Sequence, residues 1–329
     1  MVTNGFGLYL SGNEDWKIGN ISIQGKAVLS AMMKITDLPF RLLCREFGSA
    51  LAFTEMINCN AVSRGNRAAS KLFTSCEEDK PLGIQLLGSQ PDKLTRSAEL
   101  IIENMPHEQF FFDMNFSCPD EKVLKQGAGA ALLQRPKRIH DIIKALKELN
   151  YPVSAKIGLT SNNASNIPKN IKLLEKTGVD AIIVHARTIR QKNTGKPKWD
   201  AIKIAKEIAD VPIIGNGGIS QISNTFHDML TFTNCDAVMI GKETIFNPGL
   251  FQKLEKGQDW RNFTLSDRIQ WIEKYLSLAI DYQVSEKRKI LRIKDFLRPI
   301  LTNEELSRYL NLSKENPAEF LEVIKKIGT

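Results

Sequence analysis

A single cysteine, Cys118, follows an apolar run in the segment of residues 113–133, DMNFSCPDEKVLKQGAGAALL. A Gly-Ala-Gly sequence at residues 127–129 then permits a tight turn before a helix. Strands of α/β barrels deliver reactive groups into loops in this way, at the C-terminal face of the barrel. We therefore interpret the segment as an active-site loop with Cys118 as its reactive thiol. The alternative is a buried thiol that packs as a small apolar group.

Other polar residues lie at the ends of strand-like runs, where an α/β barrel directs side chains toward its ligand. They are Gln85, Asn115, Lys156, His185, Arg187, Asn216, Gly217, Gly218, Gly241 and Lys242. The glycines after the seventh and eighth runs would let backbone N–H groups approach an anion. This arrangement indicates a cofactor that carries a phosphate.

Some of these assignments have a structural alternative. The glycines in residues 215–218 could form only a tight turn. Lys156 could point outward, although an inward ammonium would need an anionic or carbonyl partner to offset its loss of hydration. His185 could be a core histidine, although its position near Arg187 favours contact with a ligand.

Eight short apolar runs, separated by helix-like segments, predict the elements that position these residues. The runs cover residues 26–32, 49–56, 81–88, 109–116, 152–158, 180–186, 211–217 and 236–242. Regular alternation of strands and helices predicts a parallel sheet. Eight strands favour a closed (β/α)8 TIM barrel over an open, doubly wound sheet. Residues 16–24 alternate in polarity and could form a hairpin that closes the bottom of the barrel.

The alternation of strands and helices stops after residue 249, and the remaining sequence has helical periodicity. We therefore expect a catalytic barrel over residues 1–250 and a C-terminal helical domain over residues 251–329. Helical spacing in residues 286–298 could gather basic side chains into a stripe that contacts phosphates, with the apolar residues packed inward. The alternative is an ordinary solvated helix face. The basic residues are Lys287, Arg288, Lys289, Arg292, Lys294 and Arg298, and the apolar ones are Ile290, Leu291, Ile293, Phe296 and Leu297.

Composition narrows the class of protein. The chain has 329 residues, of which 42% are hydrophobic and 25% charged, as in ordinary globular proteins. Its net charge of +8 favours an anionic partner. The five cysteines show no zinc-like spacing, so we expect free thiols and no metal site. No apolar run approaches the roughly 20 residues that cross a bilayer, and we expect a cytoplasmic protein without a membrane partner.

Several motifs resemble those of the tRNA-dihydrouridine synthases, FMN-dependent (β/α)8 enzymes that reduce uridine in tRNA. Residues 29–41, LSAMMKITDLPFR, are similar to the family pattern L-A-P-M-A-G-V-T-D-x-P-F-R. Residues 115–133 are similar to N-x-G-C-P-x-x-x-V-x-x-x-G-A-G-x-x-L-L. Further matching segments follow in order at residues 54–56, 85–88, 154–158, 184–188, 215–219 and 240–242. The chain departs from the family pattern at Ser30, Ala31, Lys34, Ser117, Gly218 and Lys242.

The resemblance implies FMN at the barrel mouth and NADPH, or NADH, as electron donor. Hydride would pass from reduced FMN to C6 of the uridine, and Cys118 would donate a proton to C5. The implied cofactor-binding residues are Met32, Gln85, Lys156, His185, Asn216, Gly217, Gly218, Gly241 and Lys242. The implied tRNA-binding residues are Asn115, Arg187, Lys287, Arg288 and Arg292, with residues 251–329 as a tRNA-binding domain. We further expect a monomer that does not bind DNA.

Two other functions stay open at this stage. Residues 115–119, NFSCP, also resemble a segment of the dihydroorotate dehydrogenases, FMN barrels that act on a free pyrimidine. The first-loop motif and the long helical C-terminal region favour the tRNA enzymes. A barrel that binds RNA without catalysis is the other possibility, and the set of polar residues at the strand ends disfavours it.

Overall fold

The computed structural model describes residues 15–160, 165–188, 190–191, 194–220, 225–259 and 262–327. Residues 1–14 of the expected barrel domain and residues 328–329 of the expected helical domain lie outside the described residues. Eight parallel strands form a closed barrel, because β11 pairs with β3 and β4 pairs with β6. The predicted (β/α)8 barrel is therefore confirmed. In chain order the barrel strands are β3 (Ala27–Leu29), β4 (Leu51–Phe53), β6 (Leu82–Leu87), β7 (Phe110–Phe116), β8 (Val153–Leu159), β9 (Ala181–Thr188), β10 (Ile213–Asn216) and β11 (Ala237–Ile240).

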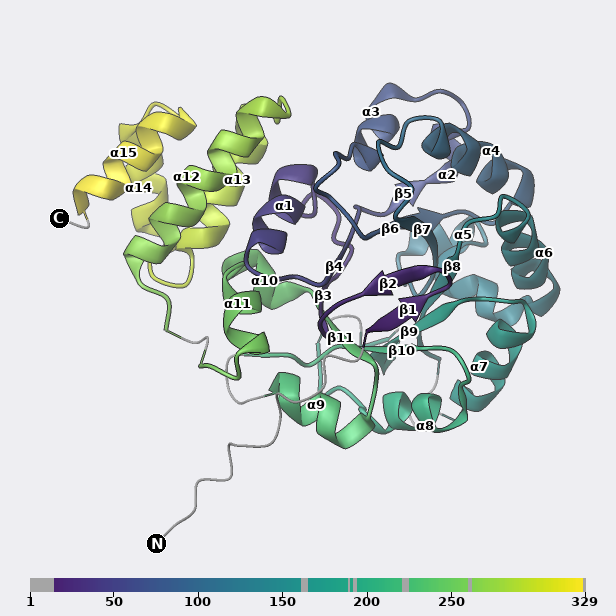
Figure 1. Cartoon of the computed structure of the whole chain (residues 1–329). Coiled ribbons are helices and arrows are strands. Elements are labelled where there is room, and N and C mark those ends of the chain that lie inside the picture. Colours follow the sequence, from purple (N-terminus) through teal and green to yellow (C-terminus); the bar gives the residue numbers. More distant parts are fainter. Residues whose placement is uncertain are drawn as a thin grey trace, which may run out of the picture.

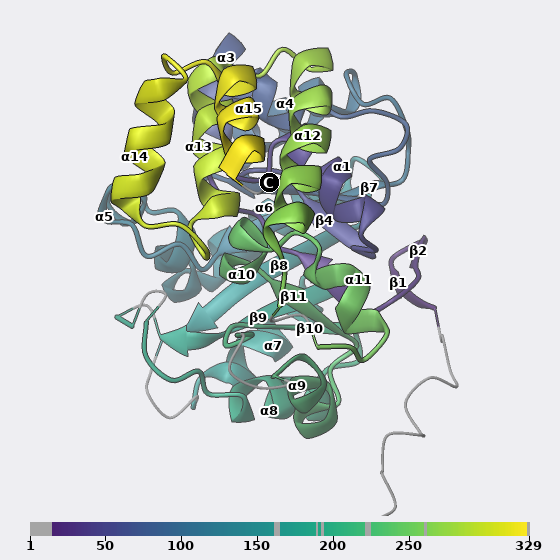
Figure 2. The ribbon, with the colours of Figure 1, turned by 90° about the vertical axis from the view of Figure 1, so that its left-hand side faces the viewer.

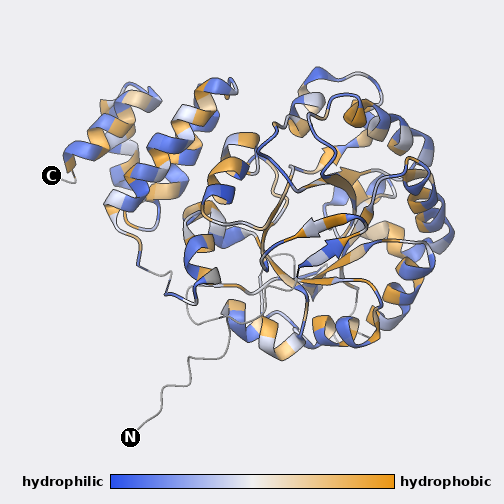
Figure 3. Cartoon of the chain, in the orientation of Figure 1, coloured by the Kyte–Doolittle hydropathy of each residue, from blue (hydrophilic) through white to orange (hydrophobic). Residues whose placement is uncertain are grey.

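The barrel strands are buried on both faces. All residues of β6, β7 and β8 are buried, and the strands are mostly hydrophobic in Figure 3. Helices cover the outer face and side chains fill the interior, so parallel strands consist of nearly continuous apolar runs. Each of the eight predicted runs overlaps one of these strands, and β8 and β9 extend past the ends of their runs, to Leu159 and Thr188. A short extra strand, β5 (Ile57–Asn58), pairs with the end of β6.

Helices surround the barrel, as Figure 1 shows. The helices of at least nine residues in this layer are α1 (Leu38–Glu46), α4 (Pro91–Ile102), α6 (Pro136–Lys147), α7 (Ile167–Lys176), α8 (Asp200–Ile208) and α9 (Thr225–Thr233). The shorter ones are α2 (Cys59–Val62), α3 (Arg67–Ser70), η1 (Lys71–Phe73), α5 (Glu121–Lys125), η2 (Gly129–Gln134), α10 (Lys242–Phe246) and α11 (Leu250–Glu255).

An antiparallel hairpin lies at the N-terminal end of the barrel. Its strands are β1 (Trp16–Ile18) and β2 (Ile21–Ile23), within the region where the sequence suggested one. Their apolar side chains pack against barrel residues such as Val28 and Phe111. Figure 2 shows the hairpin and α5 on opposite sides of the molecule. The hairpin therefore covers the end opposite the loops that follow β7.

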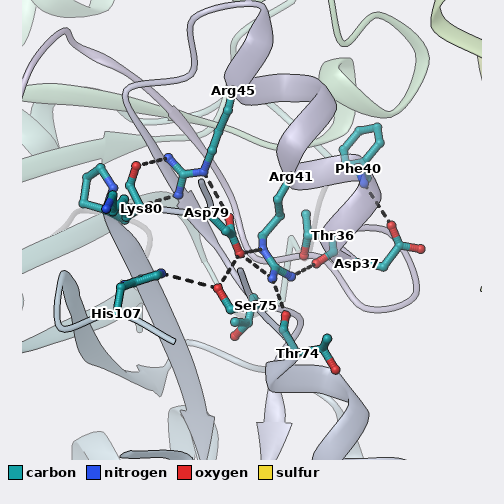
Figure 4. Close-up of polar contacts among 12 residues, drawn as sticks. Thr36, Asp37, Phe40, Arg41, Arg45, Thr74, Ser75, Asp79, Lys80 and His107 are labelled. Carbon is teal, nitrogen blue, oxygen red and sulfur yellow. Dashed lines mark hydrogen bonds and ion pairs between the residues drawn. The ribbon is translucent and has the colours of Figure 1, made fainter. Parts of the chain in front are cut away.

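A buried ion cluster anchors α1 (Figure 4). Asp79 is fully buried and accepts hydrogen bonds from Arg41, at 2.6 and 2.9 Å, and from Arg45, at 3.0 Å. The Ser75 hydroxyl also donates to it. Arg41 donates in addition to the carbonyl oxygen of Thr36, at 2.8 Å. The cluster thus ties the segment before β6 to α1 and to the loop that follows β3.

Four helices form the C-terminal part of the chain: α12 (Leu265–Asp281), α13 (Glu286–Leu297), α14 (Asn303–Leu312) and α15 (Pro317–Ile327). They pack on the barrel through α1 and α10 (Figure 1). Aromatic rings fill this contact, with Phe40 of α1 stacked on Phe296 and Phe47 edge-on to Trp271. Helix α11 contacts β3 and so belongs to the barrel layer. The first helix of the four-helix unit, α12, begins at Leu265, and the expected domain boundary at residue 251 stays a prediction.

Candidate active site at the C-terminal ends of the strands

A cavity of about 1220 Å³ opens at the C-terminal ends of the barrel strands. All twelve barrel residues that the sequence analysis selected line it. They are Met32, Gln85, Asn115, Cys118, Lys156, His185, Arg187, Asn216, Gly217, Gly218, Gly241 and Lys242. Met33, Met56 and Met239, which the sequence analysis did not select, add apolar walls. The closed barrel thus brings residues that are up to 210 positions apart in the sequence, from Met32 to Lys242, into one site.

A chain of hydrogen bonds beneath the cavity holds the Cys118 loop. Buried Asp113 accepts from the Ser154 hydroxyl at 2.7 Å and from Gln85 Nε2 at 2.8 Å. Gln85 Oε1 must then face the other way, and it accepts from Asn115 Nδ2 at 2.9 Å. Asn115 Oδ1 accepts in turn from the backbone N–H of Cys118, at 2.8 Å. Because each amide has one donor end and one acceptor end, Asp113 fixes the orientation of both.

Asp113 and Ser154 were missed in the sequence analysis. Each lies two positions before a selected residue on its strand, Asn115 and Lys156 respectively, and therefore on the same, inward face. A charged residue inside the apolar run of residues 109–116 was the available signal. Burial raises the pKa of the Asp113 carboxyl, while the hydrogen bonds from Gln85 and Ser154 act in the opposite direction.

Lys156 presents its amine to the cavity. Within the described part of the chain it has no hydrogen bond or ion pair, although it is only 8% exposed. Burial lowers the pKa of its ammonium to about 8, and the Asp113 carboxylate limits that fall. An amine in this setting is suited to bind a carbonyl or an anionic group of a ligand, which would supply the missing partner.

His185 is a neutral imidazole at physiological pH. Burial, with smaller contributions from the positive charges of Lys156 and Arg187, lowers its pKa to about 3. It can consequently donate one hydrogen bond from one ring nitrogen and accept one at the other, without adding charge to the site.

The Cys118 side chain is half-buried beside Gly129. Burial is the main cause that raises the pKa of its thiol, so the sulfur keeps its proton at neutral pH. A Cβ on Gly129 would lie 2.8 Å from the Cys118 carbonyl oxygen and 3.1 Å from the Cys118 Cβ, and its φ is +60°. Ala130 N–H donates to the same carbonyl. Glycine at position 129 therefore lets η2 pack directly against the cysteine loop.

Two glycines after β10 form a close-packed turn at the cavity wall. Gly217 and Gly218 have φ values of +104° and +93°. A Cβ on Gly217 would lie 2.9 Å from the His185 ring, and one on Gly218 would lie 2.4 Å from Pro197. Asn216 Nδ2 donates to the Met239 carbonyl, which ties this turn to β11. The turn therefore exposes backbone where any other residue would place a side chain.

The basic residues of α13 are distributed differently from the prediction. Arg292 is only 1% exposed and donates to the carbonyl oxygens of Lys34 and Ile35, at 3.2 and 3.0 Å. Arg288 pairs with Glu55 at 2.6 Å. The prediction that Arg292 contacts tRNA phosphates is therefore wrong, because its guanidinium is enclosed between α13 and the barrel.

The outward face of α13 carries a different stripe. Leu291, which was expected to pack inward, is 46% exposed. Lys287 and Arg298 are exposed, and Lys294 is partly exposed. These four residues are spaced by four, three and four positions, so they form a single face of the helix. We call Lys287, Leu291, Lys294 and Arg298 the outer stripe. The sequence pattern showed that α13 is basic, but not which of its basic residues face outward.

A closed (β/α)8 barrel with a thiol, a buried amine and a glycine turn at its mouth defines a barrel enzyme. Comparison with known proteins narrows this class to a family. The family model for dihydrouridine synthase (Dus) matches residues 28–326. A probable tRNA-dihydrouridine synthase of Aquifex aeolicus is 33% identical over 308 residues, covering 92% of this chain and 95% of that protein. The tRNA-dihydrouridine synthase B of Pasteurella multocida is 33% identical, covering 73% of this chain and 71% of that protein.

The chain therefore belongs to the dihydrouridine synthase family, which confirms the resemblance found in its motifs. Solved structures agree on the fold. A morphinone reductase mutant in complex with tetrahydroNAD has a TM-score of 0.54 at 11% identity, covering 74% of this chain and 90% of that one. TcOYE with pHBA has a TM-score of 0.55 at 10% identity, covering 83% and 98%. In the described ranges, no helix has the length and apolar character needed to cross a membrane.

Proposed function

We propose that this protein reduces specific uridines in tRNA to 5,6-dihydrouridine, with FMN as cofactor and NADPH or NADH as electron donor. One observation carries the proposal: a protonated thiol, Cys118, and the buried amine of Lys156, which has no hydrogen bond or ion pair among the described residues, open into the same cavity. Family membership supplies the reaction class. The expected monomeric state and cytoplasmic location stay predictions.

The residues of the cavity fit FMN. The cavity exceeds the roughly 300–1,000 Å³ of a typical small-molecule site, which leaves room for a cofactor and a base together. Met32, Gln85 and Lys156 would hold the ring, with the amine of Lys156 against a polar ring edge. The phosphate would lie near the glycine turn and the start of α10, where the holding residues would be Asn216, Gly217, Gly218, Gly241 and Lys242. FMN supplies the hydride, which no side chain can provide.

Cys118 would act as the general acid. Burial keeps the proton on its sulfur at neutral pH, and a proton at that atom is what saturation of the uridine C5 position requires. Asn115 uses its amide within the protein, where it accepts from the N–H groups of Ser117 and Cys118 and donates to Gln85. We therefore assign Asn115 to positioning the cysteine loop, in place of the direct base contact expected from the sequence.

The substrate uridine must leave the base stack to enter a cavity of this depth. Arg187 lines the cavity and its Nε donates to the carbonyl oxygen of Gly195, so the guanidinium is oriented by the loop after β9. The outer stripe of α13 would bind phosphates farther along the tRNA. We therefore keep Arg187 and Lys287 from the tRNA contacts inferred from the sequence, add Lys294 and Arg298, and drop Asn115, Arg288 and Arg292.

The test is nucleoside mass analysis of unmodified tRNA after incubation with the protein, FMN and NADPH. We expect dihydrouridine with the wild type and a large loss of product with Cys118→Ala. Wild-type protein that forms no dihydrouridine on tRNA would contradict the function. Equal product from Cys118→Ala would contradict only the assignment of the acid. Turnover of free dihydroorotate, with no dependence on RNA, would favour the dihydroorotate dehydrogenase alternative.

A further inference from the structure

We propose that helix α13 holds a wall of the active-site cavity in place, and that Arg288, acting through Glu55, is a positioning residue for it. The wall is the segment of residues 32–36, which we call the pocket loop. The inference deepens the proposed function, on which its catalytic consequences rest, and it reassigns Arg288 from phosphate binding to the organisation of the site.

The pocket loop links the cavity to the helical unit. Met32, Met33 and Ile35 line the cavity. The opposite side of the loop meets α13, where Arg292 donates to the carbonyl oxygens of Lys34 and Ile35. The Lys34 N–H donates to the Glu55 carboxylate, and Arg288 pairs with the other oxygen of the same carboxylate. Backbone groups of the loop are thus bound by α13 either directly or through Glu55.

The conformation of the loop needs such support. Lys34 has a φ of +62°, in the left-handed region that a side chain with a Cβ disfavours. The motif resemblance places a glycine at this position, and glycine adopts such a φ readily. A strained residue persists only where the surroundings determine its conformation. Here the hydrogen bonds of Lys34 to Glu55 and Arg292 provide that constraint.

The carboxylate between the loop and the helix depends on Arg288. Glu55 is 2% exposed, and the side chain of Arg288 is 28% exposed. A buried carboxylate that loses its cation must take up a proton or move toward water. Either change weakens the bond to the Lys34 N–H. Asp37, whose carboxylate accepts from the Tyr275 hydroxyl, lies 3.6 Å from the same guanidinium and reinforces its position.

The two faces of α13 therefore have separate tasks. Its barrel side holds the pocket loop, while the outer stripe on the same helix faces away from the barrel, where it can contact an anionic partner although Arg298 also pairs with Asp295. A change at Arg288 should alter the cavity even in the absence of RNA. A change at Lys287, the adjacent residue of the outer stripe, should alter only contact with RNA.

Trypsin cleavage of the Lys34–Ile35 bond, followed by mass spectrometry on the full-length protein, measures the order of the loop directly. We expect cleavage about tenfold faster in Arg288→Met than in the wild type, an intermediate rate in Arg288→Lys, and no change in Lys287→Met. The FMN dissociation constant, measured by fluorescence, should rise severalfold in Arg288→Met. It should rise less in Arg288→Lys and stay unchanged in Lys287→Met. Equal cleavage and equal FMN binding in Arg288→Met and wild type would overturn the proposal, because the pair of Arg288 with Glu55 would then have no effect on the pocket loop.

A rescue variant separates loop strain from loss of the fold. Lys34→Gly should leave FMN binding nearly unchanged in the wild type, where the loop is already held. In Arg288→Met it should restore most of the lost affinity, because glycine favours the required conformation without support. Additive effects of the two substitutions would contradict the proposal. The cleavage assay does not depend on catalysis. It therefore tests the role of Arg288 even if the protein forms no dihydrouridine and the proposed function is wrong.

Discussion

Lys156→Met should raise the free energy of unfolding of the protein and weaken its binding of FMN. Lys156 is buried, and the pKa of its ammonium falls from 10.5 to about 8 in the folded protein. At 1.36 kcal/mol for each pKa unit, keeping the charge in the cavity at pH 7 costs about 3 kcal/mol. Methionine has a similar length and no charge, so the folded state of the variant does not carry this cost.

The sign of the pH dependence follows from the direction of the pKa shift. Below pH 8 the lysine is charged in both the folded and the unfolded chain, and its whole cost is present. Between pH 8 and 10.5 the folded protein releases this proton while the unfolded chain keeps it, so the wild type gains stability relative to the variant. The difference should therefore shrink to less than about 1 kcal/mol by pH 10.

Paired thermal melts of the two flavin-free proteins measure this difference, because ionisable groups that do not interact with Lys156 titrate equally in both. With about 2.1 cal/mol/K of unfolding entropy per residue, 3 kcal/mol corresponds to a Tm higher by about 4 °C at pH 7. FMN binding should weaken in the same variant, since the amine contributes to the cofactor site. Equal Tm values at pH 7, or a difference that persists at pH 10, would refute the reasoning.

Three further outcomes are expected. Asp113→Ala leaves two buried donors without an acceptor. We expect the free energy of unfolding, measured in urea, to fall by about 2 kcal/mol and kcat to fall on the order of 100-fold. A variant with normal kcat would show that the hydrogen-bond chain does not position Cys118. Gly218→Ala places a Cβ 2.4 Å from the ring of Pro197 at a φ of +93°. The protein should retain less FMN on gel filtration, and its free energy of unfolding should fall by about 1–3 kcal/mol. Unchanged FMN retention would show that the glycine turn is not part of the cofactor site. Lys294→Ala should reduce the slope of log binding constant against log salt by about 1 in filter-binding assays with tRNA; an unchanged slope would exclude the outer stripe from the interface.

Much of the site was predictable because the residues that carry it interrupt regular patterns. A lysine inside the apolar run of β8 and polar residues at the ends of β6, β7, β9 and β10 are visible in the sequence, and strand ends of a parallel barrel meet at one face. Asp113 produced the same kind of interruption and was missed. Its value lies in orienting the amides of Gln85 and Asn115, and such a chain of hydrogen bonds is seen only in three dimensions.

The tasks of the α13 arginines could not be inferred from local patterns. Basic residues lie on more than one side of this helix, so periodicity alone does not say which side is buried. Arg288 finds its carboxylate partner on Glu55, 233 residues earlier in the chain. No window of sequence contains both groups.

The eight strands and the gathering of Cys118, Lys156 and His185 followed from local sequence, since burial on both faces leaves continuous apolar runs and barrel closure brings their ends together. Only the tertiary structure, in which the helical unit packs against α1 and the pocket loop, shows that Arg288 and Arg292 contact the barrel and that the outer stripe faces solvent. The physical reason is that charge pairs form by proximity in space, which a linear pattern of charges does not specify.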